Sequence, residues 1–170
     1  MQLTPGTLLV HPRHGPATVV QVVDRAVAGT TRTYVQLQVL DTDLRIAVPL
    51  DQAARVGLRP ICGPAQITAL LTVLGSEPGV EEAMWSRRMK ANQERLRTGD
   101  LLTVAGLVRD IARRDLDHGV SAGEKDLLKL ARRPLVAELA LALGISEEDA
   151  DGRLERAVVA GADGPELVAS

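Results

Sequence analysis

The residues best suited to contact a nucleic acid lie together in the stretch MWSRRMKANQERL, residues 84–96. It holds the only tryptophan of the chain, Trp85, followed closely by Arg87, Arg88 and Lys90. An indole can stack on a base while neighbouring cations neutralise phosphates. The types and spacing of these residues therefore predict a nucleic-acid contact centred on Trp85.

A core position is the ordinary alternative for Trp85, because tryptophan is highly buried on average. On a helix its ring would share a face with Arg88 and Met89, which follow at i+3 and i+4. Two features favour a projecting ring instead. The C-terminal part is rich enough in Leu and Val to fill an interior, and Trp85 stands near an expected helix start beside a loop, where a side chain can protrude.

Metal binding and catalysis find little support in the sequence. His11 and His14 are the only close histidine pair, in a Pro/Gly turn, while Cys62 and His118 are isolated. Zinc usually requires three or four protein ligands, so we expect no metal and two exposed histidines. The sequence contains no Gly-rich phosphate loop, no G-x-S-x-G and no Cys/His protease signature. We expect no enzymatic activity and no cofactor.

Acidic residues gather where helices are expected to begin. Glu81–Glu82 and Glu147–Glu148 stand at such places, where negative charge offsets the helix dipole. Residues 135–158, LVAELALALGISEEDADGRLERAV, also have the rhythm of a helix-turn-helix. A recognition helix that begins with four carboxylates would repel DNA phosphates. We therefore interpret this segment as a packed helical hairpin.

The net charge of −2 hides an asymmetry along the chain. Residues 87–133 carry 12 Lys and Arg against 7 Asp and Glu, a net of +5. Residues 138–170 carry 2 against 8, a net of −6. The basic segment could meet phosphates, and the acidic one would discourage indiscriminate DNA binding. Charge runs are also common on solvated helix faces, so charge alone leaves both interpretations open.

Length and composition indicate an ordinary globular protein. The chain has 170 residues, of which 45% are hydrophobic, and a single cysteine, Cys62. No run of about 18 apolar residues predicts a transmembrane helix, and the N-terminus lacks the pattern of a signal peptide. We expect a cytoplasmic protein without internal disulfides and without membrane contact.

The elements that must position these residues are of two kinds. Apolar and polar residues alternate with strand period over 18–23, 34–40 and 43–48, with turn residues between these runs. About four or five short antiparallel strands in some 50 residues predict a small barrel of the SH3 or Tudor kind. From about residue 51 the period becomes helical.

Capping residues and glycines mark the ends of the expected helices, which cover 65–74, 81–98, 100–118, 121–144 and 146–160. Pro134 predicts a kink or a break in the fourth of these. The fold class is therefore α+β. We expect a small antiparallel β-barrel over residues 1–58, a C-terminal helical bundle over 59–161 and a flexible tail over 162–170.

Four stretches of the chain, taken in order, carry a family resemblance. They are GTLLVHPRHGPATV (6–19), RIAVPLDQAARVGLRP (45–60), MWSRRMKANQERLRTGD (84–100) and LVRDIARRDLDHGVSAGEKDLLKLAR (107–132). Through them the chain resembles the CarD/CdnL-type bacterial transcription regulators, which bind RNA polymerase. The Trp-Ser-Arg-Arg and Ser-Ala-Gly-Glu-Lys stretches behind a small β domain make the resemblance specific.

The resemblance implies a Tudor-like N-terminal domain that docks on the β subunit of RNA polymerase, similar to a domain of transcription-repair coupling factors. It implies a helical domain that contacts promoter DNA near the −10 element, without sequence specificity, at the upstream edge of the transcription bubble. There Trp85 would wedge into the minor groove and stabilise the open complex. The basic residues that would hold the DNA backbone are Arg87, Arg88, Lys90, Arg114 and Lys125. The free protein is expected to be a monomer that associates with the nucleoid through RNA polymerase.

On the polymerase side, Arg25 matches a contact position of the family. Several relatives carry a basic residue at the position of Ala47, and Arg45, on the same face of its strand, is the candidate replacement. Met89 stands where relatives often have an aromatic residue, so Trp85, the residue expected to act as the wedge, has a different neighbour in this chain. A protein-interaction adaptor, which docks on a nucleoprotein machine without touching DNA, is the alternative function.

Overall fold

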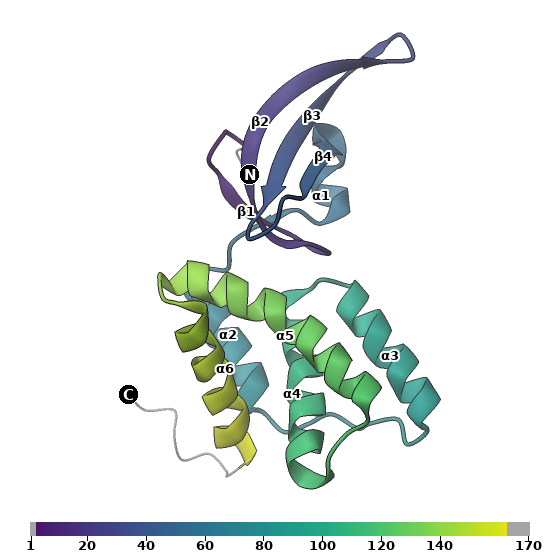
Figure 1. Ribbon diagram of the computed structural model, residues 1–170, viewed down its shortest axis with the longest axis vertical. Coiled ribbons are helices and arrows are strands. Elements are labelled where there is room, and N and C mark those ends of the chain that lie inside the picture. Colours follow the sequence, from purple (N-terminus) through teal and green to yellow (C-terminus); the bar gives the residue numbers. More distant parts are fainter. Residues whose placement is uncertain (1–2, 163–170) are drawn as a thin grey trace. The chain divides into compact units, whose positions relative to one another are not determined.

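The computed structural model describes residues 3–162, and its contacts divide the chain into two compact units, Met1–Ile61 and Cys62–Ser170 (Figure 1). The first unit is built on an antiparallel sheet and the second is helical, so the α+β class is confirmed. Of the tail predicted over 162–170, Ala162 is the last residue of helix α6 (Glu147–Ala162), and the remainder lies outside the described residues. Within the described range, none of the helices has the length and apolar character needed to cross a membrane.

The sheet of the N-terminal unit contains each of the three predicted strand runs. Its strands are β1 (Leu8–His11), β2 (Gly15–Val27), β3 (Thr30–Val39), β4 (Arg45–Pro49) and β5 (Arg59–Pro60), in the order β4-β3-β2-β1-β5. The hairpin of β2 and β3 is longer than the sequence predicted. Its two turn residues, Ala28 and Gly29, have φ values of 51° and 78°. Positive φ at both residues is what a two-residue hairpin turn needs if its twist is to match the twist of the strands.

The predicted barrel is not closed. β4 and β5 lie at opposite ends of the strand order, and no pairing between them occurs in the described part of the chain. Pro49 ends β4 and Pro60 is one of the two residues of β5. Because proline has no N–H to donate to a ladder, neither Pro49 nor Pro60 can supply a donor to bonds that would join the two edges.

The period-2 pattern gives the sheet one apolar face. Val35, Leu37 and Val39 of β3 are buried, whereas the glutamines between them are only partly so. The short helix α1 (Ala53–Val56), which follows a 3₁₀ turn at Leu50–Gln52, packs against this face. The buried apolar cluster consists of Leu9, Ala17, Val19, Val35, Leu37, Val39, Val48, Ala53 and Leu58.

His11, at the end of β1, is buried, which corrects the prediction that both histidines are exposed. Its Nδ1 accepts a hydrogen bond from the backbone N–H of Arg13 at 3.1 Å, and its ring lies 4.7 Å from that of the exposed His14. Burial, with the neighbouring positive charge of His14 and Arg13, lowers the pKa of His11 to about 4. Among the described residues no group of three or more His, Cys, Asp or Glu could hold a metal ion.

We expect His11 to titrate near pH 4 rather than at its ordinary 6.5. Below pH 6.5 the unfolded chain binds a proton that the folded chain does not, so protonation favours unfolding. The contribution of His11 to stability is therefore complete above about pH 6.5 and is lost as the pH falls toward 4. Proton NMR titration of the histidines, with His11→Asn to assign the resonance, measures this. A midpoint near 6.5 for His11 would contradict it.

The C-terminal unit contains every predicted helix. These are α2 (Pro64–Gly75), α3 (Trp85–Arg97), α4 (Leu101–His118), α5 (Ala122–Leu143) and α6 (Glu147–Ala162). α3 begins four residues later than predicted, because Met84 is extended and residues 81–84 form no helical turn. α5 continues through Pro134 as one helix, so the break, one of the two outcomes predicted there, does not occur. Proline removes the bond to the carbonyl of Leu130, and Leu130 is exposed, so water can replace that bond.

The predicted caps determine where the helices begin. The Asp100 side chain accepts the N–H of Thr103 at 2.9 Å, and Ser146 accepts that of Asp149 at 3.0 Å. Ser121 and Glu124 form the predicted capping box of α5. The carboxylates Glu147 and Glu148 lie in the first turn of α6, where they offset the helix dipole as predicted.

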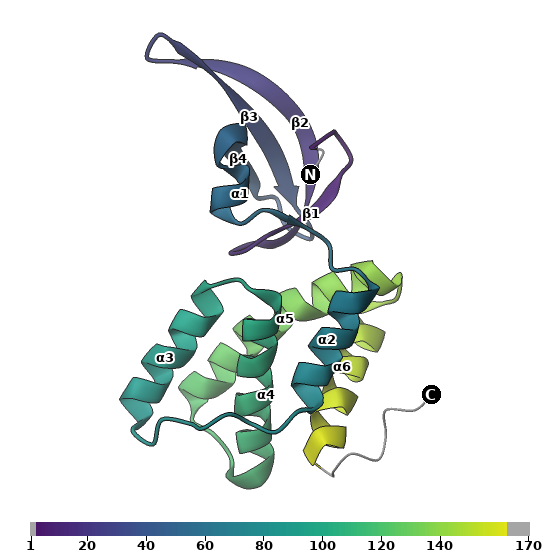
Figure 2. The same ribbon diagram turned by 180° about the vertical axis from the view of Figure 1, so that it is seen from behind.

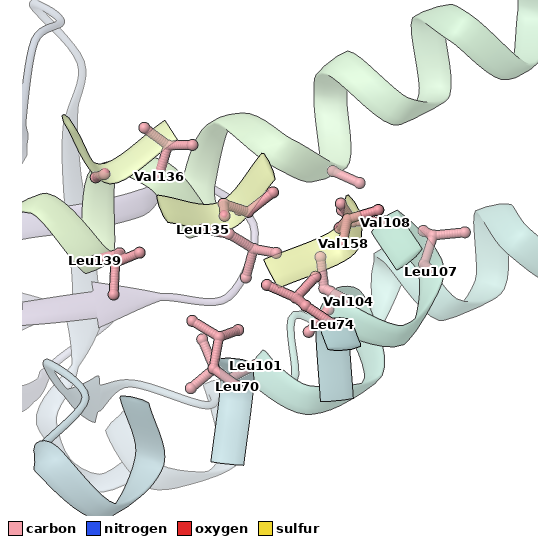
Figure 3. Packing of buried hydrophobic residues seen from close by; sticks show 14 of the residues in the cluster. Leu70, Leu74, Leu101, Val104, Leu107, Val108, Leu135, Val136, Leu139 and Val158 are labelled. Carbon is pink, nitrogen blue, oxygen red and sulfur yellow. The ribbon is translucent and has the colours of Figure 1, made fainter. Parts of the chain in front are cut away.

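Leucine and valine side chains from α2, α4, α5 and α6 fill one shared core (Figure 3). α3 contributes to it only through the partly buried Met89 and Leu96. The two fully buried residues of α3 are polar, Arg88 and Asn92. Figures 1 and 2 show α3 at the outer edge of the unit, beside α4 and α5. Polar contacts therefore carry a large part of the attachment of α3.

Candidate nucleic-acid interface

The indole of Trp85 lies at the surface of the helical unit and not in its apolar core. Trp85 is the first residue of α3 and is 50% exposed. Its Nε1 donates a hydrogen bond of 3.2 Å to Oγ of Ser121, the N-cap residue of α5. A Cβ added to Gly123 would lie 4.0 Å from its Cζ2. One part of the ring thus rests on the first turn of α5, and about half of the side chain faces solvent.

Arg88 lies inside the protein, where it connects α3 with α5. It is only 6% exposed. Its Nε donates to Oε1 of Glu124 at 3.0 Å, and its Nη1 donates to the carbonyls of Glu82 at 3.0 Å and Ala83 at 3.3 Å. The guanidinium is engaged within the fold, which is a different role from the phosphate contact that the sequence predicted. We do not include Arg88 in the candidate interface.

Glu124 joins this ion pair to the indole. Its Oε2 accepts the backbone N–H of Ser121 at 3.1 Å and the Ser121 hydroxyl at 2.8 Å. Burial alone would raise the pKa of Glu124, but these two donors and the Arg88 guanidinium outweigh it and lower the pKa from its ordinary value. The carboxylate is therefore charged at neutral pH. A continuous chain of hydrogen bonds runs from Arg88 through Glu124 and Ser121 to Trp85.

Arg87 and Lys90 are two exposed cations of α3. They stand at i and i+3 and are therefore neighbours on the solvent side of the helix. Neither forms an ion pair with any residue in the range 3–162. Both side chains are free to approach an anion.

The two remaining predicted cations differ in their availability. Arg114 donates to Oε2 of Glu81 at 2.7 Å and so fastens the segment before α3 to α4. Lys125 lies 4.0 Å from Oδ1 of Asp115, and its side chain is 55% exposed. It follows Ser121 by four residues, which places it on the side of α5 that carries the indole. Lys125 therefore joins Arg87 and Lys90 as an accessible cation.

Arg25 and Arg45 lie on the polar face of the sheet but not at one spot. The register pairs Arg45 with Gln38 and Arg25 with Arg32, and these two β3 residues stand six positions apart. At the rise of a strand this separates the rows by about 20 Å. Arg45 donates to Oε1 of Gln38 at 3.0 Å, while the Arg25 guanidinium lies 5.9 Å from the centre of the Tyr34 ring.

Both units match known families. Residues 3–62 match the CarD-like/TRCF RID domain, and residues 69–155 match the C-terminal domain of CarD. The chain belongs to the CarD family. A relative of similar length is YdeB of Bacillus subtilis (strain 168), which its name proposes as a transcription factor. It is 22% identical over 143 residues, which cover 84% of this chain and 94% of YdeB.

Membership of the CarD family confirms the resemblance and indicates a transcription-associated regulator. In this CarD-family chain, sequence reasoning missed the partner of the indole, Ser121. The capping box at Ser121 was recognisable from its spacing. Its contact with a residue 36 positions earlier in the chain left no local signal.

Proposed function

We propose that this CarD-family protein docks on the β subunit of RNA polymerase and stabilises the open promoter complex. In this proposal the Trp85 indole enters the minor groove at the upstream edge of the bubble. The observation that carries it is a half-exposed indole at the start of α3, a helix that also carries cations with no partner among residues 3–162. Such a ring can stack on a base without leaving a cavity in the core.

The sign of the effect follows from the two states of the DNA. A ligand shifts an equilibrium only by its difference in affinity for the two states. An indole stacked at the junction of paired and unpaired bases contributes about 1–3 kcal/mol. In closed DNA the same insertion must first unstack a base step, which costs on the order of a few kcal/mol. The protein therefore favours the melted state, and about 1.4 kcal/mol already gives a tenfold change.

The accessible cations supply a weak attraction to the DNA backbone. Arg87, Lys90 and Lys125 would neutralise about three phosphates. The complex of the protein with free DNA would then have a dissociation constant on the order of 10⁻⁴ M. Docking on polymerase raises the effective concentration to about the millimolar range. The DNA contact then forms only where the polymerase has placed the protein.

Polymerase docking is assigned to the sheet unit, which is proposed to adopt a Tudor-like fold. Domains of the matching family are known for their interaction with RNA polymerase. The strand order leaves β4 at one end of the sheet, and a partner can add a strand to such an edge. Arg45 lies on this strand. Arg25 lies on the same polar face of the sheet, in a row distant from Arg45.

Charge reversal of the two α3 cations tests the backbone contact. We expect Arg87→Glu with Lys90→Glu to shorten the lifetime of the open complex and to reduce the slope of its logarithm against log[salt] by about 2. Open-complex decay measured at several salt concentrations gives this slope. Arg153→Glu with Arg156→Glu, an exposed pair of the same spacing on α6, is the matched control. An unchanged slope in the α3 variant would favour the adaptor that does not touch DNA.

A further inference from the structure

The indole of Trp85 is held in one orientation by the first turn of α5. Residues 121–123, which we call the indole seat, lie beside it. Oγ of Ser121 accepts the indole N–H at 3.2 Å, and a Cβ at Gly123 would stand at an ordinary contact distance, 4.0 Å, from the ring carbon Cζ2. The rest of the ring is exposed.

Hydrogen bonding within the capping box fixes the direction of the Ser121 contact. A serine hydroxyl has one hydrogen and two lone pairs. Its hydrogen is directed to Oε2 of Glu124 at 2.8 Å, so Oγ presents its lone pairs to the backbone N–H of Glu124 and to Trp85. Because Glu124 is itself held by the buried Arg88, the acceptor for the indole is rigidly placed.

Gly123 allows α5 to approach α3 closely. A Cβ at this position would lie 2.9 Å from Cε of Met89 and 4.0 Å from Cζ2 of Trp85. The first of these distances is too short for a real contact, but Cε is the flexible end of the Met89 side chain and can move aside, and the second is an ordinary contact distance. Gly123 therefore bears on the approach of the two helices and not on the position of the indole.

We propose that Ser121 is a positioning residue that orients the Trp85 indole before it meets DNA. This inference rests on the proposed function. An aromatic side chain fixed in advance loses less rotamer freedom on binding than a mobile one. The seat therefore lengthens the lifetime of the open complex through Trp85, without touching DNA itself.

The test compares Ser121→Ala with Ser146→Ala, which removes the corresponding N-cap serine of α6. Both variants lose one cap. We expect only Ser121→Ala to lower the fluorescence anisotropy of Trp85, the sole tryptophan, and to shorten the open-complex lifetime by about three- to tenfold. Ser121→Thr, which keeps the hydroxyl, should restore both readouts.

A Trp85→Phe background separates the hydrogen bond from the cap, because phenylalanine has no N–H. There Ser121→Ala and Ser146→Ala should give equal lifetimes. If Trp85→Ala shortens the lifetime but Ser121→Ala behaves like Ser146→Ala in the wild-type background, the inference is wrong while the proposed function stands. If Trp85→Ala leaves the lifetime unchanged, the proposed function fails and the inference with it.

Discussion

Trp85→Ala should fold normally and bind RNA polymerase, yet lose most of the effect on the open complex. The side chain is half exposed and lies outside the apolar core, so its removal should change the free energy of unfolding by about 1 kcal/mol or less. The lost stacking should shorten the open-complex lifetime by about five- to 150-fold. Circular dichroism during urea unfolding measures the first quantity, and decay after a competitor is added measures the second.

A matched truncation shows whether the effect belongs to the indole. Leu130→Ala removes another large, exposed apolar side chain, on the outer side of α5, and should leave the lifetime unchanged. If Trp85→Ala unfolds the helical unit instead, the ring has a structural role that its exposure does not indicate. The interpretation as a DNA contact would then lose its main support.

Glu124→Ala should destabilise the helical unit by about 3–5 kcal/mol. The substitution leaves the Arg88 guanidinium buried without its carboxylate and also breaks the capping box of α5. Urea unfolding followed by Trp85 fluorescence measures the loss. The effect should exceed that of most single substitutions, because few of them leave a buried charge without a partner.

The exposed pair of Arg97 and Glu94 is the control for this variant. Its atoms lie 2.9 Å apart, against 3.0 Å for Arg88 and Glu124, but its side chains are 75% and 59% exposed. Glu94→Ala should therefore change stability by no more than about 1 kcal/mol. Equal losses for Glu94→Ala and Glu124→Ala would show that the buried pair does not fasten α3.

Local sequence signals predicted the elements well, because their causes are local. Strand alternation identified β2, β3 and β4, and caps such as Asp100 and Ser121 located the helix starts. The start of α3 was placed too early, since Glu81 and Glu82 are bound by Arg114 and by a backbone N–H rather than by a helix. The prediction of a closed barrel was wrong, because closure needs pairing between the edge strands β4 and β5, and alternation within a strand does not say which strands pair.

The site shows the same division between local and distant causes. The exposure of Trp85 was predicted from the supply of other core residues and from its place beside a loop. The burial of Arg88 was not, because its partner Glu124 stands 36 positions later. His11 was expected at the surface for a similar reason, since its turn is polar in sequence while the fold covers the ring.

Cross-linking from position 85 tests the central claim most directly. The full-length protein would carry the photoreactive analogue p-benzoylphenylalanine in place of Trp85, in complexes with RNA polymerase and promoter DNA, and a second version would carry it at Leu130. We predict cross-links from position 85 to nucleotides at the upstream edge of the bubble, strongest once the promoter has melted, and none from position 130. Cross-links from position 85 to protein alone would contradict the account.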